Sequence, residues 1–549
     1  MTSLTATNKK PIIWTVSGSD CSGGAGIAAD IKTGHGLGVE VCHLITANTV
    51  QNSYQLVSVN AVPVAILKQQ ADILLDDKPP SVIKIGLLAN ADQVQWLTLL
   101  LVEYKKLLPN LLSVYDPVGQ ASVGGSFNSL TLEDLSPLLR QVNVITPNLL
   151  EANNLAASLT DIKNDVEGLV SIKQLAQTIH HDFGITSIII KGGHSADEQS
   201  SSDYCYHQLN QLSEEKQDNQ DKTKEAIIYH LSAKRIDTHY SHGGGCSFAA
   251  ALSAFLAQGY LMRDAFTLGK AFITQGLAAS EKVSQQVNKL AGDQYYGAFE
   301  QQGWPRNADF FPQVVDELSL LYKELPAFNS LNLIGNKLGL YPVIDSLYWL
   351  KRLLPLGLEI IQLRVKNLSE KELEQVIIEA VELAKNYKTR LFINDYWQLA
   401  IKHGAYGVHI GQEDLQDADL TAIQQSGIRL GISTHGCYEF LLAQQLQPSY
   451  VAIGAIFPTK TKDMTGQIQG LDNLKQVLVL RPENPLSPIP VVAIGGISLE
   501  RAPEVVSTGV ESIAVVTAIT ESEKSHGISP EQAVVKLQKS IRAPSVDRQ

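Results

Sequence analysis

Eight short apolar runs recur between residues 338 and 518, and an amphipathic stretch follows each of them. The runs are LGLYPVI, IIQLRVK, RLFIND, YGVHIG, RLGIST, YVAIGAI, VVAIGG and SIAVVTA, and SEKELEQVIIEAVELAKNY is one of the amphipathic stretches. Eight strand–helix units within about 215 residues have the number and the length that a TIM (β/α)8 barrel requires. We therefore predict such a barrel over residues 331–545.

The first half has a different rhythm, also of the α/β class. Its likely strands are IIWTVS, VCHLITA, VIKIGLL, LLSVYDP, VNVITP and TSIIIK, with helical patterns between them. This alternation predicts a doubly wound α/β/α sandwich over residues 11–280, in which ligands gather beyond the carboxyl ends of the strands. Residues 281–330 form a connector. Because the connector contains Trp304, Phe310 and Phe311, we expect it to pack against a domain.

A polar stretch from Glu198 to Glu225 interrupts the first half. Short strand patterns at residues 204–209 and 227–230 bracket it, so we predict a hairpin with a solvated tip. A mobile lid is the functional alternative.

Composition narrows the classes of partner. The 549-residue chain has 44% hydrophobic and 18% charged residues, a formal charge of -12, and five cysteines without a C-x-x-C pair. The acidic balance argues against nucleic acid or an anionic membrane as the main partner. The cysteine pattern, and the lack of a signal peptide or a long apolar run, predict a cytoplasmic protein. A homo-oligomer is compatible with the sequence.

A glycine-rich loop stands just before a strong helical pattern in the first half. The segment S-H-G-G-G-C-S, Ser241 to Ser247, puts three glycines ahead of AAALSAFLAQG. The N–H groups of Gly243, Gly244 and Gly245 can form an anion hole at the helix N-terminus. Cys246 lies in the same positive field, which favours its thiolate and suits the base of a kinase. The alternative is a flexible loop with a buried structural cysteine.

A second glycine-rich segment, G-A-G-I-A-A from Gly24 to Ala29, formally matches a dinucleotide-binding pattern. We expect the preceding strand to end around Val16, too early for the tight strand-to-helix turn that this pattern needs. A nicotinamide cofactor is therefore disfavoured.

Further segments sharpen the kinase hypothesis: T-A-N-T-V-Q-N-S, K-I-G-L-L-A, D-P-V, T-P-N-L-L-E and K-G-G-H. Together with the loop, residues 11–280 resemble hydroxymethylpyrimidine and hydroxymethylpyrimidine-phosphate kinases of the ribokinase-like family. The resemblance implies Cys246 as the catalytic base, magnesium organised by Asn148 and Glu151, and Lys191 near the ATP phosphates. It also implies a pyrimidine pocket made by Asp20, Gln51, Leu87 and Val118.

Each of these residues has a structural alternative, and two depart from the family pattern. Asp20 could cap a helix, Asn148 could form a turn, and Glu151 could be a solvated helix residue. The family usually shows H-G-T-G-C, where this chain has Gly244 in place of Thr. Leu87 stands where Met is common, a swap that conserves volume. Because the anion hole uses backbone N–H groups, we expect kinase function to survive.

In the second half, polar side chains fall at the carboxyl ends of the predicted strands. Gln362, Arg364 and Lys366 alternate along one strand, so we expect them on one face. Asp395 and Asp414 follow the third and fourth strands. A basic set beside two carboxylates suggests a diphosphate neutralised by cations and a carboxylate-held Mg²⁺. The alternative is a stabilising ion-pair network without a ligand.

These segments resemble the thiamine-phosphate synthase family, notably GLYPVIDS, LFINDYWQLAIKHGAYGVHIGQEDL, LGISTH, FPTKTK and VAIGGIS. The resemblance implies that Asp395 and Asp414 hold Mg²⁺. It implies contacts to a pyrimidine diphosphate from Gln362, Arg364, Lys366, Asn394, Ser433 and Lys462. It further implies a thiazole phosphate site made by Thr459, Thr461, Gly496, Val516 and Thr517.

The two resemblances combine into one chemical expectation. The first half would phosphorylate hydroxymethylpyrimidine and then its phosphate with ATP, and the second would couple the resulting diphosphate to thiazole phosphate. Two alternatives are a non-catalytic kinase half and a kinase half that phosphorylates pyridoxal-like alcohols.

Overall fold

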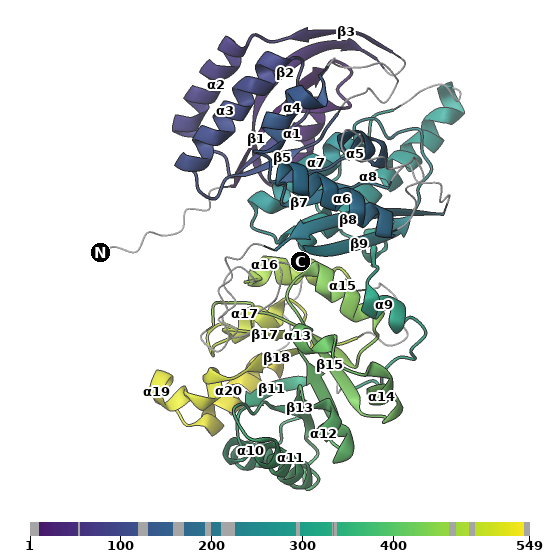
Figure 1. The fold of residues 1–549 in the computed structure, drawn as a ribbon. Helices are drawn as coiled ribbons and strands as arrows, with labels where there is room; N and C mark the ends of the chain where they lie inside the picture. Colours follow the sequence, from purple (N-terminus) through teal and green to yellow (C-terminus); the bar gives the residue numbers. More distant parts are fainter. Residues whose placement is uncertain are drawn as a thin grey trace. The chain divides into compact units, whose positions relative to one another are not determined.

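A computed structural model describes residues 10–52, 55–118, 130–156, 169–192, 199–209, 226–291, 297–331, 333, 337–459, 468–481 and 489–542. The chain divides into two compact units (Figure 1). Unit 1 comprises Met1–Pro305 and Asp309–Val315, and unit 2 comprises Arg306–Ala308 and Asp316–Gln549.

Unit 1 is built on one mixed sheet. Its described strands are β1 (Ile12–Asp20), β2 (Glu40–Gln51), β3 (Leu56–Ala61), β4 (Val82–Ile85), β5 (Leu112–Tyr115), β6 (Val144–Ile145), β7 (Ser187–Ile190), β8 (Ser200–Gln208), β9 (Ala226–Lys234) and β10 (Gln313–Val314). They lie in the order β10-β9-β8-β7-β6-β5-β4-β1-β2-β3. In this order, the neighbouring strands β7, β6, β5, β4, β1 and β2 pair in parallel. β8, β9 and β10 extend one edge of the sheet with antiparallel pairs, and β3 does so at the other edge. The strand order reverses at β1, which creates the switch point where such sheets bind ligands.

Helices cover both faces of this sheet. On one face lie α2 (Val64–Asp77), α3 (Ala91–Leu107), α4 (Leu132–Leu139), α5 (Leu149–Ala156) and α6 (Leu169–Phe183). The other carries α1 (Gly26–Gly36), α7 (Gly244–Ala257) and α8 (Met262–Ala291), and α7 packs on both neighbours. The strands between the layers are nearly all apolar and buried, as expected of a sheet covered on both sides. The predicted doubly wound α/β/α sandwich is confirmed.

Two predictions in unit 1 had different outcomes. The hairpin is confirmed, since β8 and β9 pair antiparallel along their whole length, and its tip at residues 210–225 lies outside the described residues. The expected end of the first strand near Val16 is wrong, because β1 continues to Asp20. Its last residues pair with the extended β2 strand, which prolongs the ladder.

Unit 2 is a closed parallel barrel, which confirms the predicted TIM architecture. Its strands are β11 (Gly339–Ile344), β12 (Ile360–Leu363), β13 (Arg390–Asn394), β14 (Gly407–Ile410), β15 (Arg429–Thr434), β16 (Tyr450–Ile453), β17 (Val491–Ile494) and β18 (Ser512–Val515). β18 pairs with β11 and closes the ring. Each predicted apolar run contains one of these strands.

Helices surround the barrel strands in chain order (Figure 1). They are α10 (Leu347–Leu353), α11 (Glu370–Ala384), α12 (Trp397–Lys402), α13 (Gln412–Leu415), α14 (Leu420–Gln425), α15 (Cys437–Gln445), α16 (Gly470–Leu478), α17 (Ala502–Ser507), α18 (Thr517–Thr520), α19 (Ser522–His526) and α20 (Pro530–Arg542). Helix α11 begins with a capping box between Ser369 and Glu372 and buries one apolar stripe.

The residues between the halves divide between the units. Trp304 packs edge-on against Phe255 in unit 1, with ring centroids 5.4 Å apart. Helix α9 (Glu317–Leu321) belongs to unit 2, where the Phe328 N–H donates to the Gln447 carbonyl and Leu331 joins the barrel core. The connector is therefore packed, as its aromatic residues suggested. Among the described residues, no helix is long and apolar enough to cross a membrane.

Candidate active sites

The predicted kinase residues gather beyond the carboxyl ends of the strands of unit 1. Asp20 ends β1, Leu87 follows β4, Val118 follows β5, Asn148 follows β6, and Lys191 follows β7. In a parallel sheet these ends lie along one edge, so the side chains converge on the switch point at β1.

Asp20 organises the loop that leads into α1. Its carboxylate accepts hydrogen bonds from the backbone N–H groups of Ser22, Gly24 and Ala25 at 2.8, 3.1 and 2.9 Å. It also lies 2.9 Å from His242 Nε2. Burial by itself would raise the pKa of Asp20, but the hydrogen bonds from His242, Gln51 and Ser22 hold it well below the usual range.

This arrangement brings Asp20 and Gln51 together, as the pyrimidine hypothesis requires. It also disfavours the dinucleotide hypothesis for a new reason. Although β1 leads closely into α1, the N–H groups of the G-A-G segment that would bind a pyrophosphate already donate to Asp20.

The glycine-rich loop before α7 packs against the same segment. Gly243 has a φ of +84°, and an added Cβ would lie 1.8 Å from the Gly24 carbonyl oxygen. Only glycine fits this position. A Cβ on Gly245 would lie 3.6 Å from Lys191 Nζ, so the start of α7 and the Lys191 ammonium face the same space. The predicted anion hole and its cation are therefore adjacent.

Cys246 lies in the first turn of α7, but the expected thiolate is wrong for the resting site. Burial raises the pKa of the thiol to about 11, even though Lys84 and the Gly26 N–H oppose this shift. Asp116 and Asp30 add to it. In this site, desolvation and two carboxylates outweigh the field of the helix N-terminus.

A buried ion pair beneath Cys246 is a feature that sequence reasoning missed. Lys84 Nζ lies 2.9 Å from Asp30 Oδ2, and both side chains are almost fully buried. Asp30 raises the pKa of Lys84 against the effect of burial, and Cys246 also interacts with this ammonium. A lysine inside the apolar run VIKIGLL was the available signal, because a lysine is seldom fully buried unless it is paired.

Asp116, Glu151 and Lys191 form a second charged cluster. Lys191 Nζ lies 2.9 Å from Asp116 Oδ1. Burial raises the pKa of Glu151 to about 7, and Asp116 adds to the rise while Lys191 opposes it. Glu151 is thus no solvated helix residue. Asn148 and Glu151 also exchange hydrogen bonds of 2.7 and 2.8 Å between side chain and backbone, so Asn148 caps α5, a structural role other than the turn considered for it.

In the barrel, two carboxylates and two cations meet beyond β12, β13 and β14. Burial first, and the charge of Asp414 second, raise the pKa of Asp395 to about 6, whereas Arg364 and Lys366 lower it. One detail of the prediction is wrong: β12 ends at Leu363, so Arg364 and Lys366 lie in the following loop. The charges still converge, since Arg364 and Lys366 both interact with Asp395.

The remaining predicted pyrimidine contacts that the structure describes belong to β12, β13 and β15. Gln362 and Asn394 are buried, and Asn394 Nδ2 donates to Asp395 Oδ2. Ser433 Oγ lies 2.8 Å from His409 Nε2. Lys462 and Thr461 fall outside the described residues.

The predicted thiazole phosphate residues lie after β16, β17 and β18. The Phe457 N–H donates to the Gly495 carbonyl at 3.0 Å, which holds the loop of Thr459 beside that of Gly496. Gly496 has a φ of +62°. Val516 and Thr517 follow β18, the strand next to β17. This is the region where TIM barrels often bind phosphate.

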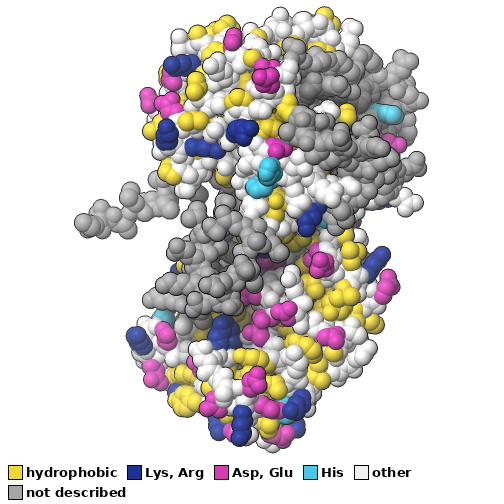
Figure 2. Space-filling model, viewed as in Figure 1, with side chains coloured by type: hydrophobic (Ala, Val, Ile, Leu, Met, Phe, Trp, Pro, Cys, Tyr) yellow, Lys and Arg dark blue, Asp and Glu magenta, His cyan; other side chains and the backbone are white. Residues whose placement is uncertain are grey.

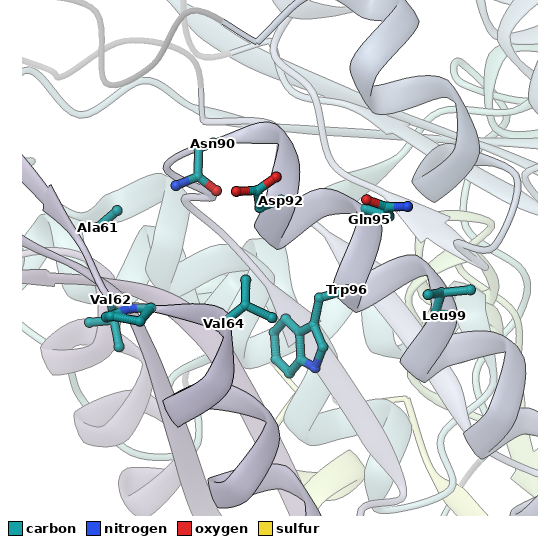
Figure 3. Close-up of a pocket in the computed structure, with 9 residues that line it drawn as sticks. Ala61, Val62, Val64, Asn90, Asp92, Gln95, Trp96 and Leu99 are labelled. Atoms are coloured by element: carbon teal, nitrogen blue, oxygen red, sulfur yellow. The ribbon is translucent and has the colours of Figure 1, made fainter.

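A surface pocket of unit 1 contains none of the predicted site residues. It lies between the start of α2 and the first turns of α3, with Val64, Asp92, Trp96 and Leu99 in its lining (Figure 3). On the visible face of unit 2, acidic and basic side chains are interspersed (Figure 2). Neither feature competes with the strand ends as a catalytic site.

The chain carries two candidate active sites, one on each of two α/β units, and the similarity to known families assigns both units to transferases. A phosphomethylpyrimidine kinase family model matches residues 20–291, and a thiamine monophosphate synthase family model matches residues 340–519. The thiamine-phosphate synthase of Yersinia pseudotuberculosis is 59% identical over 184 residues, which are 34% of this chain and 83% of the relative. That of Photorhabdus laumondii is 56% identical over 188 residues, 34% and 85% of the two chains.

Solved structures resemble unit 1. The phosphomethylpyrimidine kinase from Clostridium difficile is 26% identical, covers 48% of this chain and 99% of its own, and has a TM-score of 0.38. The pyridoxal kinase from Staphylococcus aureus in complex with pyridoxal is 27% identical, covers 49% and 89%, and has a TM-score of 0.40.

The chain belongs to the thiamine-phosphate synthase family through its barrel and carries a phosphomethylpyrimidine kinase domain ahead of it. It is a bifunctional enzyme of thiamine biosynthesis.

Proposed function

We propose that unit 1 uses ATP to convert hydroxymethylpyrimidine to its phosphate and then to its diphosphate, and that unit 2 joins this diphosphate to thiazole phosphate. The supporting observation is the convergence of charged groups at the carboxyl ends of both sets of strands. In unit 1, Lys191, Cys246 and the glycine loop meet there. In unit 2, Asp395, Asp414 and two cations meet there.

In the kinase site, each group has a distinct task. Gly243 and Gly245 would stabilise the transferring phosphoryl group through their N–H groups, and Lys191 would neutralise its charge. The third member of the predicted anion hole, the Gly244 N–H, donates to the Ser241 carbonyl at 3.0 Å and is occupied by that bond. Cys246, once ionised, would take the proton of the pyrimidine alcohol as the alcohol oxygen bonds to the γ-phosphorus of ATP, while the bond from that phosphorus to the bridging oxygen breaks and ADP leaves. Asp20, Gln51, Leu87 and Val118 would hold the ring, and Asn148 with Glu151 would organise magnesium.

Magnesium fits the barrel site on the chemistry of its donors. Asp395 and Asp414 repel each other, as the raised pKa of Asp395 reflects, and a cation between them would remove that repulsion. When bound, Mg²⁺ would neutralise the charge of the diphosphate. Arg364, Lys366, Asn394 and Lys462 would bind the same group, while Gln362 and Ser433 would bind the ring.

Coupling then needs little acid–base chemistry. The bond from the exocyclic CH₂ to the diphosphate oxygen breaks, and the aminopyrimidine ring delocalises the positive charge left on carbon. The thiazole nitrogen attacks this carbon with its lone pair. Thr459, Thr461, Gly496, Val516 and Thr517 would align the thiazole through its phosphate. Charge neutralisation and alignment, the two contributions this site offers, are those that the step requires.

One assay tests the whole proposal. Purified protein is incubated with Mg·ATP and either hydroxymethylpyrimidine or pyridoxal, with and without thiazole phosphate, and the products are separated. We expect the pyrimidine mono- and diphosphates, and thiamine phosphate when thiazole phosphate is present. Phosphorylation of pyridoxal alone would establish a pyridoxal-type kinase half, and no phosphorylation would establish a non-catalytic one.

Cys246→Ala tests the base directly. Because a positioned base contributes roughly 10²–10⁴-fold to a rate, we expect kinase turnover to fall by about that factor while synthase turnover is unchanged. Cys205→Ala is the matched control, since Cys205 is buried in β8 away from the site. Near-normal kinase turnover in a folded Cys246→Ala variant would remove Cys246 from the mechanism.

A further inference from the structure

Five side chains form a continuous hydrogen-bonded chain across the interior of the barrel. Ser433 Oγ lies 2.8 Å from His409 Nε2, and His409 Nδ1 lies 2.8 Å from the Tyr450 hydroxyl. The Tyr450 and Tyr341 hydroxyls are 2.7 Å apart, and Gln362 Nε2 donates to the Tyr341 oxygen at 3.2 Å. His409, Tyr450 and Tyr341 are each less than 7% exposed. The chain therefore joins Gln362 to Ser433, two residues placed in the pyrimidine pocket, through groups shielded from water.

Each group in this chain constrains the next. A hydroxyl has one proton to donate, and a neutral imidazole has one N–H and one acceptor nitrogen. His409 is buried, and each of its ring nitrogens faces a hydroxyl, an arrangement that suits a neutral ring with one donor and one acceptor nitrogen. A chain of such groups has only two self-consistent directions, and choosing the donor at one end determines every proton in it.

The Gln362 amide determines in which direction the hydrogen bonds of this chain run from donor to acceptor. Its nitrogen donates to the Tyr341 hydroxyl, so its carbonyl oxygen is the end of the amide that stays outside this chain of hydrogen bonds. Tyr341 then donates to Tyr450, and Tyr450 donates to His409 Nδ1. His409 carries its proton on Nε2 and donates to Ser433 Oγ. The Ser433 proton is left for a ligand.

We propose that His409, Tyr450 and Tyr341 are positioning residues that set the hydrogen-bonding polarity of the pyrimidine pocket, with an acceptor at Gln362 Oε1 and a donor at the Ser433 hydroxyl. This proposal rests on the placement of the pyrimidine at these two residues. The pocket selects a ring that offers a donor to Gln362 and an acceptor to Ser433. An aminopyrimidine has both, in its exocyclic amino group and its ring nitrogens. The analogue with an oxo group in place of the amino group presents an acceptor to an acceptor, and a pocket built for hydrogen bonding rejects such a mismatch strongly.

The tautomer of His409 tests the polarity without any substrate. The measurement is a two-bond correlation spectrum of the full-length protein labelled with ¹⁵N-histidine, recorded near pH 7. The signal of His409 is assigned by its absence from the spectrum of His409→Gln. We expect Nε2 to be protonated and Nδ1 to be unprotonated. Gln362→Glu replaces the amide donor with an acceptor, so the chain should reverse and move the proton to Nδ1. An Nδ1–H tautomer in the wild type, or an unchanged tautomer in folded Gln362→Glu, would overturn the proposal.

Catalysis supplies the second test. Tyr450→Phe keeps the ring but cuts the chain, and we expect kcat/KM for the pyrimidine diphosphate to fall about tenfold, the range for a buried group left without its partner. Discrimination against the oxo analogue should shrink as well. Tyr406→Phe is the control. Like Tyr450, Tyr406 packs on Phe392, but it lies just before β14, at the amino end of that strand.

Tyr341→Phe interrupts the chain of hydrogen bonds one residue further from Ser433 and should lower kcat/KM and the discrimination in the same way. The test therefore does not depend on the folding of a single variant. Unchanged discrimination in a folded chain-cutting variant would contradict the proposal. Failure of the wild type to make thiamine phosphate would instead contradict the function, while the tautomer measurement would still stand.

Discussion

At the scale of single residues, burial decides the resting charge at both sites. Cys246 begins a helix and faces Lys84, two features that favour a thiolate, yet desolvation prevails. Asp395 is held partly neutral by burial and by Asp414. Desolvation disfavours the charged form of both groups, whereas at Asp20 the hydrogen bonds from His242, Gln51 and Ser22 outweigh it.

The pH dependence of the kinase follows from Cys246. Because its pKa is raised to about 11, the thiolate is a small fraction at pH 7 and grows about tenfold with each pH unit below that pKa. We expect kcat/KM for the pyrimidine alcohol to rise steadily from pH 7.5 to 9.5 at saturating Mg·ATP. Cys246→Asp, which is ionised throughout this range, should flatten the profile. A wild-type profile that is flat from pH 7.5 upward would contradict the assignment.

Asp395→Asn should abolish the effect of Mg²⁺ on the barrel without destabilising the metal-free fold. The native state holds the Asp395 proton up to about pH 6, whereas the unfolded chain loses it near pH 4, so the native state is penalised as pH rises through this window. Removing the charge should stabilise the metal-free barrel at pH 7 by on the order of 1–2 kcal/mol, discounted for partial exposure.

The measurement is the barrel transition in calorimetry of the full chain, with and without Mg²⁺, together with synthase turnover. Mg²⁺ should raise the wild-type transition temperature but not that of Asp395→Asn, and the variant should lose most of its turnover. An equal Mg²⁺ effect in both proteins would move the metal site away from Asp395.

At the scale of elements, the start of α7 places side by side two glycines, Gly243 at the N-cap and Gly244 in the first turn, that differ in what they require of a side chain. Gly243 needs a positive φ and touches the Gly24 carbonyl, whereas a Cβ on Gly244 would meet nothing closer than Phe299 at 4.0 Å. Gly244 therefore occupies a position where the usual Thr of the family has space. The packing around position 244 therefore does not require a residue without a side chain.

A matched pair of substitutions tests this difference. Gly243→Ala should disrupt the loop and lower kinase turnover more than tenfold, because the strain and the clash at Gly24 displace the anion hole. Gly244→Thr should change turnover far less and should not destabilise unit 1, since it replaces a helical glycine. Kinase rates and the unit 1 melting transition check both effects. Equal loss in the two variants would show that Gly244 also needs to be glycine.

At the scale of the whole molecule, each unit contains its own site. The candidate site residues of each half lie on the strand ends of their own unit, and each unit has its own core. The division falls at Val315 and Asp316, since β10 completes the sheet of unit 1 while Phe328 and Leu331 pack on the barrel.

A chain divided after Val315 should therefore keep both activities. We expect residues 1–315 to phosphorylate the pyrimidine, and residues 316–549 to couple the diphosphate to thiazole phosphate. Equimolar fragments should restore the overall reaction, more slowly only when the diphosphate is scarce, because linkage raises local concentration. A cut at Ser330 is the control and should destabilise the barrel fragment by removing Phe328. Folded fragments that are active only when mixed would indicate shared sites.

The sequence by itself determined the two folds, and it predicted a chemical type for each site that stays a prediction. Period and spacing define parallel strands, and the ends of such strands meet at one edge, so Asp395, Asp414 and Lys191 could be placed from order alone. The strand limits at Asp20 and Leu363 needed the structure, because they depend on pairing with β2 and on the turn after β12.

Only the tertiary structure decided protonation and pairing. The Lys84–Asp30 pair joins residues 54 positions apart, and the barrel chain joins Tyr341 to Tyr450 across 109 positions. Neither spacing follows from a local pattern. The charge on Cys246 depends on how completely its neighbours exclude water, a property of packing that no periodicity in the sequence records.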